Sequence, residues 1–508
     1  MIAPTIEYAE LAPLITVFAA AVIGVLIEAF APRQARHPIQ VTLALCALVA
    51  ALVQVILLAG TELVAAVGAV AVDGPALFLQ GTVLVLSIVS IGFFAERRIE
   101  GGGDAFAPAA SALPGSEDER VLVKERTLQT EVYPLALFAI GGMMLFPAAN
   151  DLLVMFVALE VLSLPLYLMC GMARRRRLLS QEAALKYFLL GAFSSAIFLF
   201  DMAFVYGYSG SLRFGEISDS LASEVGQDGL LLAGVGLMAV GLLFKVGAVP
   251  FHSWTPDVYQ GAPTPVTAFM AACTKVAAFG AMIRLFYVAF GGLRTDWQPM
   301  LWAVAIATML VGAIVALSQT DIKRMLAYSS IAHAGFILTA LVAADEAGTA
   351  AILFYLATYG LATLGAFAVV TLVRDAGGEA THLSKWAGLG KRSPILAGTF
   401  ALFLLTFAGI PLTSGFVGKL SVFTAALDGG ATPLVVVGVI ASAIAAFFYI
   451  RVIVLMFFSE PAADGPTVAV PSLWTVAGIA VATMATVVLG VVPGPLLDLA
   501  QQAAIFVR

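Results

Sequence analysis

The sequence is poor in charge. Asp, Glu, Lys and Arg make up 11% of its 508 residues, and hydrophobic residues make up 61%. A soluble domain carries roughly 25% charged residues. The low charge excludes a water-soluble globular protein and indicates that lipid is the solvent for most of the surface, in agreement with a mean hydropathy of +1.01.

Cysteine is equally scarce. The three cysteines, Cys46, Cys170 and Cys273, each stand alone in an apolar run, and no CxxC pair occurs. Iron–sulfur ligation, zinc ligation and disulfides are therefore not expected. No GxGxxG fingerprint stands in a βαβ context, which argues against a dinucleotide site. The N-terminus lacks the basic region and cleavage site of a signal peptide, so we expect a retained helix there.

Long apolar runs dominate what is present. A helix needs ~20 apolar residues to cross a bilayer, and about fourteen runs approach or exceed that length. They lie near 11–30, 41–60, 74–95, 131–148, 151–173, 181–208, 229–250, 262–290, 298–318, 322–343, 347–373, 395–427, 432–458 and 472–495. The sequence predicts an all-α polytopic membrane protein.

Basic residues gather in alternate loops of this series. Seventeen Lys and Arg residues fall on one predicted side, in the loops after runs 1, 3, 5, 9 and 11, and only Arg213, Arg294 and Arg508 fall on the other. The positive-inside rule then places the seventeen in the cytoplasm and both termini outside. The segment 96–130, rich in Gly, Ala, Pro and charge, is predicted to be a cytoplasmic loop.

The chain also contains signs of an internal repeat. Tyr187 and Tyr355 stand in similar surroundings 168 residues apart, and a proline interrupts one later run in each half, at Pro250 and Pro411. Such paired broken helices are typical of transporters built from inverted repeats. We predict two inverted five-helix units, each with a broken helix. The predicted division is an N-terminal three-helix segment 1–95, the loop 96–130, a first unit 131–290, a second unit 298–458 and a C-terminal helix 472–508.

Four ionisable residues lie deep in the apolar runs: Glu160, Lys245, Lys275 and Lys419. A charge in hydrocarbon costs at least ~2.5–3.5 kcal/mol, so an intramembrane Lys is a functional candidate by default. Together these residues suggest that the chain moves protons or ions across a membrane.

Glu160 and Lys245 are predicted to be partners, because a buried carboxylate must be paired or protonated. At 4 Å and an effective dielectric of ~20 their attraction is ~4 kcal/mol, and doubling the distance releases about half of it. A small shift in separation would therefore change how firmly Lys245 holds its proton. Lys suits this task because Arg cannot realistically deprotonate. The alternative is a static ion pair that orders the bundle.

The other candidates extend a relay from Lys245. Lys275 can receive the proton, Lys419 follows the second helix break and can serve as the exit, and His333 can bridge the two halves. A lone His is more often simply hydrogen-bonded to a neighbour. His252 lies at the first break, where it can cap freed carbonyls.

Further basic residues have weaker roles in this interpretation. Lys186 lies near the cytoplasmic end of its run, where proton entry is a speculative role. Lys323 is expected to be an interface anchor, with an inward-facing position as the alternative. Arg284 and Arg451 are expected to snorkel toward an interface.

Three segments carry a resemblance to a known family: FKVGAVPFHSWTPDVYQGAPTPVTAFMAACTKVAAFGA, DIKRMLAYSSIAHAGF and LLTFAGIPLTSGFVGKL. They resemble the antiporter-like subunits of respiratory complex I, relatives of subunits of multi-subunit sodium/proton antiporters. The resemblance covers roughly residues 130–460. Three features favour the N-type of these subunits. Lys419 stands where the M-type carries Glu, the lateral helix of the L-type is lacking, and the motif PFHSWTPDVYQGAP resembles the N-type.

The resemblance implies the relay Glu160, Lys245, Lys275 and Lys419, and proton translocation driven by quinone reduction elsewhere in a bacterial complex. It implies that NADH, flavin (FMN), iron–sulfur clusters and quinone belong to other subunits, so that this chain holds no cofactor. The implied partners are the neighbouring membrane-arm subunits, within the cytoplasmic membrane. Two alternatives stay open: a cation/proton antiporter subunit of a related non-NADH complex, and a membrane scaffold with an inert ion-pair network.

Overall fold

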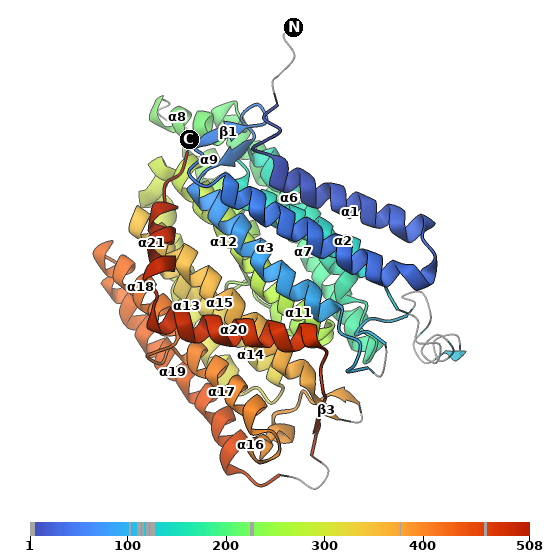
Figure 1. The fold of residues 1–508 in the computed structure, drawn as a ribbon. Helices are drawn as coiled ribbons and strands as arrows, with labels where there is room; N and C mark the ends of the chain where they lie inside the picture. Colours follow the sequence, from blue (N-terminus) through green and yellow to red (C-terminus); the bar gives the residue numbers. More distant parts are fainter. Residues whose placement is uncertain are drawn as a thin grey trace.

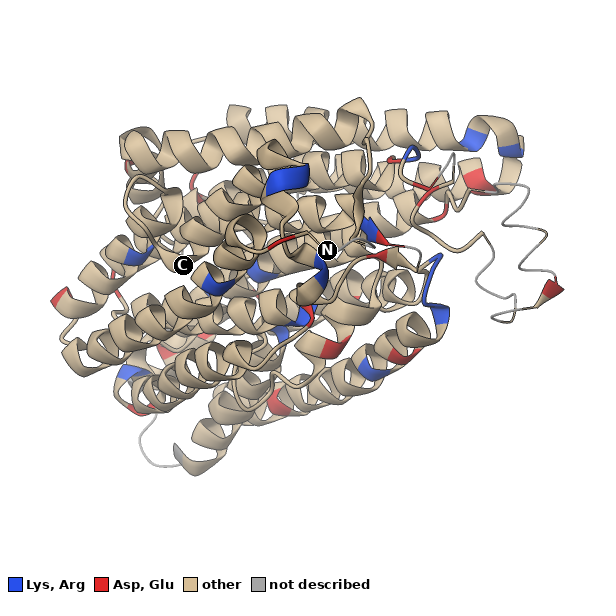
Figure 2. Ribbon diagram, turned by 90° about the horizontal axis from the view of Figure 1, so that it is seen from below, with Lys and Arg blue, Asp and Glu red and all other residues tan. Residues whose placement is uncertain are grey.

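The computed structural model describes residues 6–100, 103–108, 113, 116–117, 121, 128–223, 228–375, 377–461 and 465–507. Most of these residues are helical, and the helices pack side by side into one bundle (Figure 1). The ribbon is uncharged over most of its length, as Figure 2 shows. Parts of the predicted 96–130 loop, including residues 122–127, lie outside the described residues.

Every predicted apolar run contains a helix. In chain order these are α1 (Ala12–Phe30), α2 (Arg33–Leu57), α3 (Gly74–Phe94), α5 (Val132–Leu145) with η1 (Phe146–Ala148), α6 (Leu152–Cys170), α7 (Arg177–Ser209), α9 (Asp228–Val246), the continuous series α11 (Thr264–Phe269), η2 (Met270–Thr274), α12 (Lys275–Arg284) and η3 (Leu285–Ala289), then α13 (Arg294–Leu317), α14 (Ile322–Leu341), α15 (Glu346–Leu372), α17 (Pro394–Ala408), α18 (Ser414–Asp428), α19 (Thr432–Phe458) and α20 (Leu473–Val491). In the described part of the chain, 11 helices are long and apolar enough to cross a membrane, and two shorter apolar helices accompany them. The predicted all-α polytopic fold is confirmed.

Short elements connect these helices outside the apolar runs. The helices are α8 (Phe214–Ser223), α10 (Trp254–Gly261), η4 (Gly291–Leu293), η5 (Leu383–Trp386), α16 (Leu389–Arg392) and α21 (Gly494–Gln502). The strands are β1 (Leu63–Ala65), β2 (Val70–Val72), β3 (Val373–Asp375), β4 (Gly378–Glu379) and β5 (Thr467–Val468). β1 pairs with β2, and β3 lies between β4 and β5, all antiparallel, with Arg374 opposite Glu379.

Both predicted helix breaks are present. α9 ends at Val246, and the chain turns through Gly247 at φ +75° before α10 begins. α17 ends at Ala408, and Gly409 at φ +80° leads into the turn before α18. Glycine adopts this left-handed conformation without strain, which makes it the usual residue after a helix end. Each break leaves backbone carbonyls inside the bundle that need hydrogen-bond donors.

Matched contacts relate the two halves of the chain at an offset of 170 residues. Asp151 caps α6 by accepting from the second and third amides that follow it, and Asp321 caps α14 in the same way. Close packing repeats as well. A Cβ at Gly142 of α5 would meet the Leu162 nitrogen at 2.5 Å, and one at Gly312 of α13 would meet the Ala332 nitrogen at 2.5 Å. α5–α6 and α13–α14 are therefore equivalent pairs. The predicted unit boundaries stay a prediction.

The centre of the bundle is formed by the series α11 to η3 and by α15. Residues 264–289 are buried except for the partly buried Tyr287, and α15 is buried over nearly its whole length, whereas α1, α2 and α20 expose wide apolar faces. The π-helical turn η2 directly precedes Lys275. Such turns are rare and frequently occur at functional sites. Polar groups on these central helices are shielded from lipid.

A buried ion pair joins the ends of the chain. Arg284 on α12 is fully buried and binds Asp73 with N–O at 2.5 Å, so the prediction that Arg284 snorkels to an interface is wrong. Asp73 also caps α3 and accepts the Val507 backbone N–H at 3.0 Å, and the guanidinium lies 5.0 Å from the Phe506 ring centre. Arg451, in contrast, is exposed and donates to carbonyls at the end of α13.

Both chain ends lie beside the β1–β2 hairpin. The Glu7 carboxylate accepts the Ala66 backbone N–H at 3.0 Å, next to β1, and Val507 is held by Asp73, which directly follows β2. Figure 1 shows the C-terminus at the end of the bundle where β1 lies. The two termini are therefore on the same side of the bundle.

Replacing Arg284 with Met is expected to lower the unfolding free energy by about 3–5 kcal/mol, because it leaves the Asp73 carboxylate buried without its partner. The measurement is the thermal unfolding midpoint of the purified protein in its complex. The double variant Asp73→Asn, Arg284→Met should recover much of the loss, since Asn still caps α3 and no uncompensated charge remains. Equal midpoints for Arg284→Met and the wild type would contradict the role of the pair.

Candidate functional site

Lys245 lies in the last turn of α9 and is 4% exposed. Its ammonium donates to the Ser163 hydroxyl at 2.6 Å on α6 and to the Tyr187 hydroxyl at 3.3 Å on α7. It also lies 5.4 Å from the Tyr187 ring centre and 6.0 Å from that of Tyr167, within the range of a cation–π interaction. Neutral hydroxyls and aromatic rings therefore hold this cation.

The predicted direct ion pair between Glu160 and Lys245 is not formed. Lys245 binds Ser163 instead, which lies one helical turn after Glu160 on α6 and donates its own hydrogen bond to the Leu159 carbonyl. One carboxylate oxygen of Glu160 is buried without a hydrogen-bond partner among the described residues. In the described structure the Lys245 ammonium is therefore bound by the Ser163 hydroxyl and not by the Glu160 carboxylate.

Lys275 continues from Lys245 toward the centre. It is the first residue of α12, is 3% exposed, and donates to the Ser330 carbonyl at 2.5 Å and the Val246 carbonyl at 3.3 Å. Val246 is the last residue of α9 and follows Lys245 in sequence. A cation at a helix C-terminus is favourable because the free carbonyls there are partially negative. The first helix break thus brings two predicted relay residues together.

His333 lies at the centre of the bundle on α14. Its Nδ1 is 2.6 Å from the Tyr355 hydroxyl, and its Nε2 is 3.4 Å from the Tyr449 hydroxyl. The rings of Phe336, Tyr359 and Phe407 surround it. A cavity of about 10 Å³ adjoins it, which is roughly the space that one water needs. His333 can exchange hydrogen bonds in two directions.

Lys419 repeats the arrangement of Lys275 at the second break. It lies on α18, is 5% exposed, and donates to the Ala408 carbonyl at 3.0 Å and the Ser442 hydroxyl at 2.7 Å. Ala408 is the last residue of α17. The ammonium also lies 4.8 Å from the Phe336 ring centre. At each break, the last carbonyl of the interrupted helix therefore accepts a hydrogen bond from a buried lysine.

The internal equivalence connects two of these sites. An offset of 170 residues carries Ser163 onto His333, and an offset of 168 carries Tyr187 onto Tyr355. In the first half, the serine and the tyrosine hold Lys245, and in the second half the histidine and the tyrosine bind each other. Lys245 and His333 therefore lie at corresponding centres of the two halves. Sequence reasoning missed Ser163, because a lone Ser in a helix more often bonds its own backbone.

Lys186 and His252 do not join the group of buried residues formed by Lys245, Lys275, His333 and Lys419. Lys186 is 42% exposed and pairs with Glu182 at 2.7 Å and with Asp257 at 2.8 Å, and Asp257 also binds Arg324 at 2.6 Å. His252 is half-buried at the first break and has no hydrogen-bond partner for Nδ1 in the described structure. Partly exposed ion pairs of this kind contribute little to stability.

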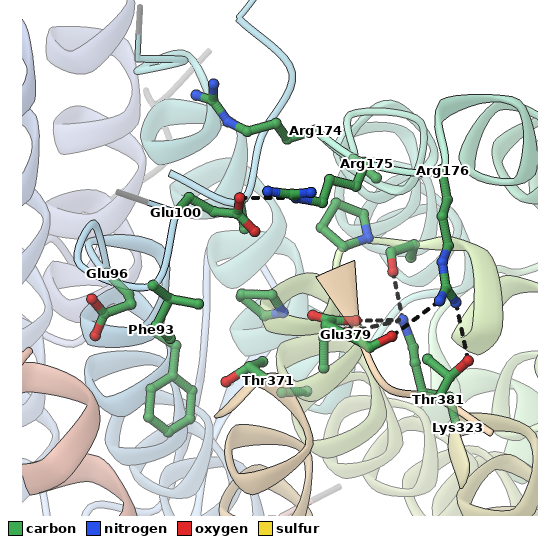
Figure 3. Close-up of a pocket in the computed structure, with 18 of the residues that line it drawn as sticks. Phe93, Glu96, Glu100, Arg174, Arg175, Arg176, Lys323, Thr371, Glu379 and Thr381 are labelled. Atoms are coloured by element: carbon green, nitrogen blue, oxygen red, sulfur yellow. Dashed lines mark hydrogen bonds and ion pairs between the residues drawn. The ribbon is translucent and has the colours of Figure 1, made fainter. Parts of the chain in front are cut away.

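Lys323 is not an interface anchor but faces inward, at 2% exposed. Its ammonium donates to the Ala262 carbonyl at 2.8 Å and to the Thr264 hydroxyl at 3.0 Å, and it lies 3.9 Å from the Glu379 carboxylate. These groups line a pocket of about 80 Å³ that Figure 3 shows. The inward alternative for Lys323 is the one the structure supports.

Asp201 is a buried acid to which the sequence assigned no role. It is fully buried on α7, and neither carboxylate oxygen has a hydrogen-bond partner within the described structure. It shares a helix face with Tyr187 and Ser194, at spacings of seven residues. The sequence feature that could have identified Asp201 is a single Asp in an otherwise apolar run. In the described part of the chain, no group of three or more His, Cys, Asp and Glu residues could hold a metal ion.

Comparison with protein families gives one match over most of this site. Residues 149–445 match the family model described as NADH:quinone oxidoreductase/Mrp antiporter, TM. The chain is 64% identical to NADH-quinone oxidoreductase subunit N of Rhodococcus opacus, over 100% of this chain and 97% of that protein. It is 58% identical to subunit N of Mycobacterium tuberculosis, over 100% and 99%.

Solved structures agree. A chain of respiratory complex I from Thermus thermophilus with bound aureothin matches with a TM-score of 0.78 and 33% identity, over 96% of this chain and 99% of that one. A chain of the Mrp complex from Dietzia matches with a TM-score of 0.82 at 21% identity, over 97% of each chain. The match to the Mrp complex chain shows that the two chains share a fold.

Replacing Ser163 with Ala is expected to destabilise the protein by about 1–3 kcal/mol, because the buried Lys245 ammonium loses its shorter hydrogen bond. The thermal unfolding midpoint of the complex measures this. Ser194→Ala on α7 is the matched control, since Ser194 bonds only the Gly241 carbonyl at 3.4 Å. If both variants unfold at the same temperature, Ser163 does not hold Lys245.

Proposed function

This chain belongs to the subunit N family of bacterial NADH–quinone oxidoreductases, and from that premise we propose that it translocates protons through a relay of buried Glu, Lys and His side chains. Membership makes it a multi-pass membrane subunit whose partners are the other membrane subunits of the complex. One observation carries the proposal. Lys245, Lys275 and Lys419 are buried cations bound to neutral oxygens, which leaves each able to release a proton.

The switch of the relay lies at Glu160 and Lys245. Because Ser163 and not Glu160 contacts the ammonium, the carboxylate stabilises the protonated lysine only in part. Approach of the two groups to ~4 Å would add up to ~4 kcal/mol of attraction at an effective dielectric of ~20. Separation removes that attraction and leaves an ammonium in an apolar setting, which favours proton release. The distance between Glu160 and Lys245 thus acts as the switch.

The released proton passes to Lys275, which lies beside the end of α9, and then to His333 and Lys419. Lys275 binds the carbonyl of Ser330, one turn before His333 on α14. The Tyr355 and Tyr449 hydroxyls and the small cavity beside His333 offer the next hydrogen bonds. Lys419 at the second break receives the proton last. Water must complete the steps between these groups.

The sidedness follows from the distribution of basic residues. The end of the bundle that holds Arg174 to Arg177, Lys323, Arg324 and Arg374 is proposed to be cytoplasmic, by the positive-inside rule. Both termini lie beside the β1–β2 hairpin, which belongs to the opposite side in this orientation. They are therefore proposed to be extracytoplasmic.

The redox chemistry is proposed to belong to other subunits. NADH, flavin, iron–sulfur clusters and quinone would bind there, and this chain would act as a translocase that uses the energy of quinone reduction. The sequence supports this division, because it lacks a nucleotide fingerprint and cysteine pairs.

A second candidate is a cation/proton antiporter subunit of a related complex that does not oxidise NADH. The fold shared with the Mrp complex chain favours it. Purification of a tagged chain separates the two candidates. The peripheral NADH-oxidising subunits should accompany it if the first proposal holds, and their consistent absence would favour the second.

Replacing Lys245 with Ala is expected to lower the number of protons translocated per NADH oxidised, because the switch residue is lost. The measurement is proton uptake and NADH oxidation in the same inverted membrane vesicles. Lys245→Arg should fail as well, since Arg keeps the charge but does not release a proton. The exposed Lys385→Ala is the control. A normal proton yield from Lys245→Ala in an intact complex would remove Lys245 from the pathway.

Replacing Lys419 with Glu is expected to retain partial proton translocation, because either side chain can carry a proton. The same vesicle assay measures it. Lys419→Met, which carries none, should be lower. Complete loss of assembly in Lys419→Glu would instead assign Lys419 a structural role at the end of α17.

A further inference from the structure

The pocket of about 80 Å³ lies at the end of the bundle where α7, α11 and α14 begin. It is lined by an unusual number of charged side chains, namely Glu96, Glu100, Arg174, Arg175, Arg176, Lys323, Arg374 and Glu379. Figure 3 shows the three consecutive arginines on one side and Glu379 and Lys323 on the other. In the proposed orientation this pocket faces the cytoplasm.

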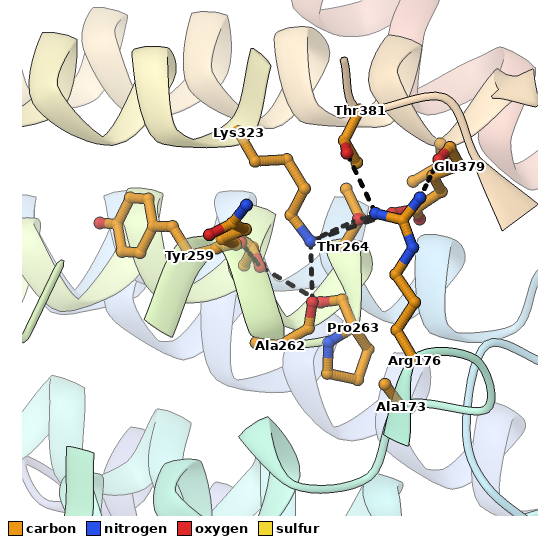
Figure 4. Close-up of polar contacts among 12 residues, drawn as sticks. Ala173, Arg176, Tyr259, Ala262, Pro263, Thr264, Lys323, Glu379 and Thr381 are labelled. Carbon is orange, nitrogen blue, oxygen red and sulfur yellow. Dashed lines mark hydrogen bonds and ion pairs between the residues drawn. The ribbon is translucent and has the colours of Figure 1, made fainter. Parts of the chain in front are cut away.

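Two opposite charges in the pocket differ in their access to solvent. The Glu379 side chain is 22% exposed and the Lys323 side chain is 2% exposed, with 3.9 Å between Oε2 and Nζ. The carboxylate therefore meets the pocket while the ammonium lies behind it. Figure 4 shows Lys323 reaching toward Glu379 from the start of α14.

The Thr264 hydroxyl connects these two groups. It donates to Glu379 Oε2 at 2.5 Å and accepts from Lys323 Nζ at 3.0 Å. A hydroxyl can donate one proton while it accepts another. The arrangement is a continuous hydrogen-bonded chain from a partly exposed carboxylate to a buried lysine.

Arg176 fixes the position of the carboxylate. Its guanidinium donates to the Glu379 backbone carbonyl at 3.0 Å and to the Thr381 hydroxyl at 3.0 Å (Figure 4). Arg176 precedes α7, whereas Glu379 belongs to the β3–β4 hairpin. The contact joins the two halves of the chain at the pocket and makes Arg176 a positioning residue.

A polar path leads inward from Lys323. Ser330 lies seven residues further along α14, on the same face and about 10 Å deeper. Its hydroxyl is buried without a hydrogen-bond partner in the described structure, and its carbonyl accepts from Lys275 at 2.5 Å. Lys323 is thus joined to the relay along one helix face.

We propose that this pocket is the proton inlet of the relay and that Glu379 is its loading group, an inference that rests on the proposed function. Glu379 takes a proton from solvent in the pocket. The carboxylic acid then gives its proton to the Thr264 oxygen as the Thr264 hydroxyl gives its own to a neutral Lys323 Nζ. Glu379 returns to a carboxylate, Thr264 is unchanged, and Lys323 becomes an ammonium that can pass a proton toward Ser330 and Lys275.

The first test is Glu379→Gln in the intact complex, assayed for proton uptake and NADH oxidation in inverted vesicles. The proton yield should fall as far as in Lys245→Ala, because Gln cannot load a proton. Glu460→Gln is the matched control, since Glu460 is 85% exposed and binds only Lys391. If Glu379→Gln pumps like the control while Lys245→Ala does not, the inlet is wrong and the relay stands. If Lys245→Ala also pumps normally, the proposed function fails.

The second test separates loading from folding. Glu379→Ala opens space for a small acid, so added formate should restore part of the proton yield, whereas chloride at equal concentration should not. Thr264→Val should show the low yield without rescue by formate, because the connection to Lys323 is broken. An assembled Glu379→Ala complex that formate leaves unchanged would overturn the loading role.

Discussion

The need of a buried ammonium for oxygen acceptors organises the centre of this protein. Lys245, Lys275 and Lys419 are each 5% exposed or less, and none of them forms an ion pair at contact distance in the described structure. Hydroxyls and free carbonyls hold them instead. Neutral acceptors satisfy the hydrogen bonds of a cation without fixing its protonation state. A bound carboxylate, in contrast, would hold the lysine in its protonated form.

The helix breaks supply part of that environment. An unbroken helix uses its own carbonyls, so a lysine packed against it would find none free. Here α9 and α17 end inside the bundle, and their last carbonyls accept from Lys275 and Lys419. The repeat places one such end in each half. Ser163 and His333 occupy equivalent positions in the two halves. Ser163 binds the Lys245 cation, whereas the His333 ring lies between two tyrosine hydroxyls.

Much of this could be predicted from the sequence. Long apolar runs indicate membrane-spanning helices, so the helices were predictable. Pro250 and Pro411 correctly indicated the two breaks, although a proline alone does not decide a break, because Pro165 lies inside the continuous helix α6. The isolated charges identified Lys245, Lys275 and Lys419 for the same reason. Contacts between distant helices could not be read in this way. Arg284 looked able to reach an interface, yet its partner Asp73 lies 211 residues away. Lys323 lies near the start of its helix, where basic residues commonly anchor a helix at the membrane interface. The sequence of the hairpin that contains its partner Glu379 does not predict a β-hairpin.

The Asp73–Arg284 pair has a consequence for how the chain is made. Asp73 is synthesised early and Arg284 later, whereas Phe506 and Val507, which complete their surroundings, are synthesised long after both. The Asp73–Arg284 pair therefore stays incompletely covered until Phe506 and Val507 are made. A chain that lacks Phe506 and Val507 would therefore keep the Asp73–Arg284 pair without this cover.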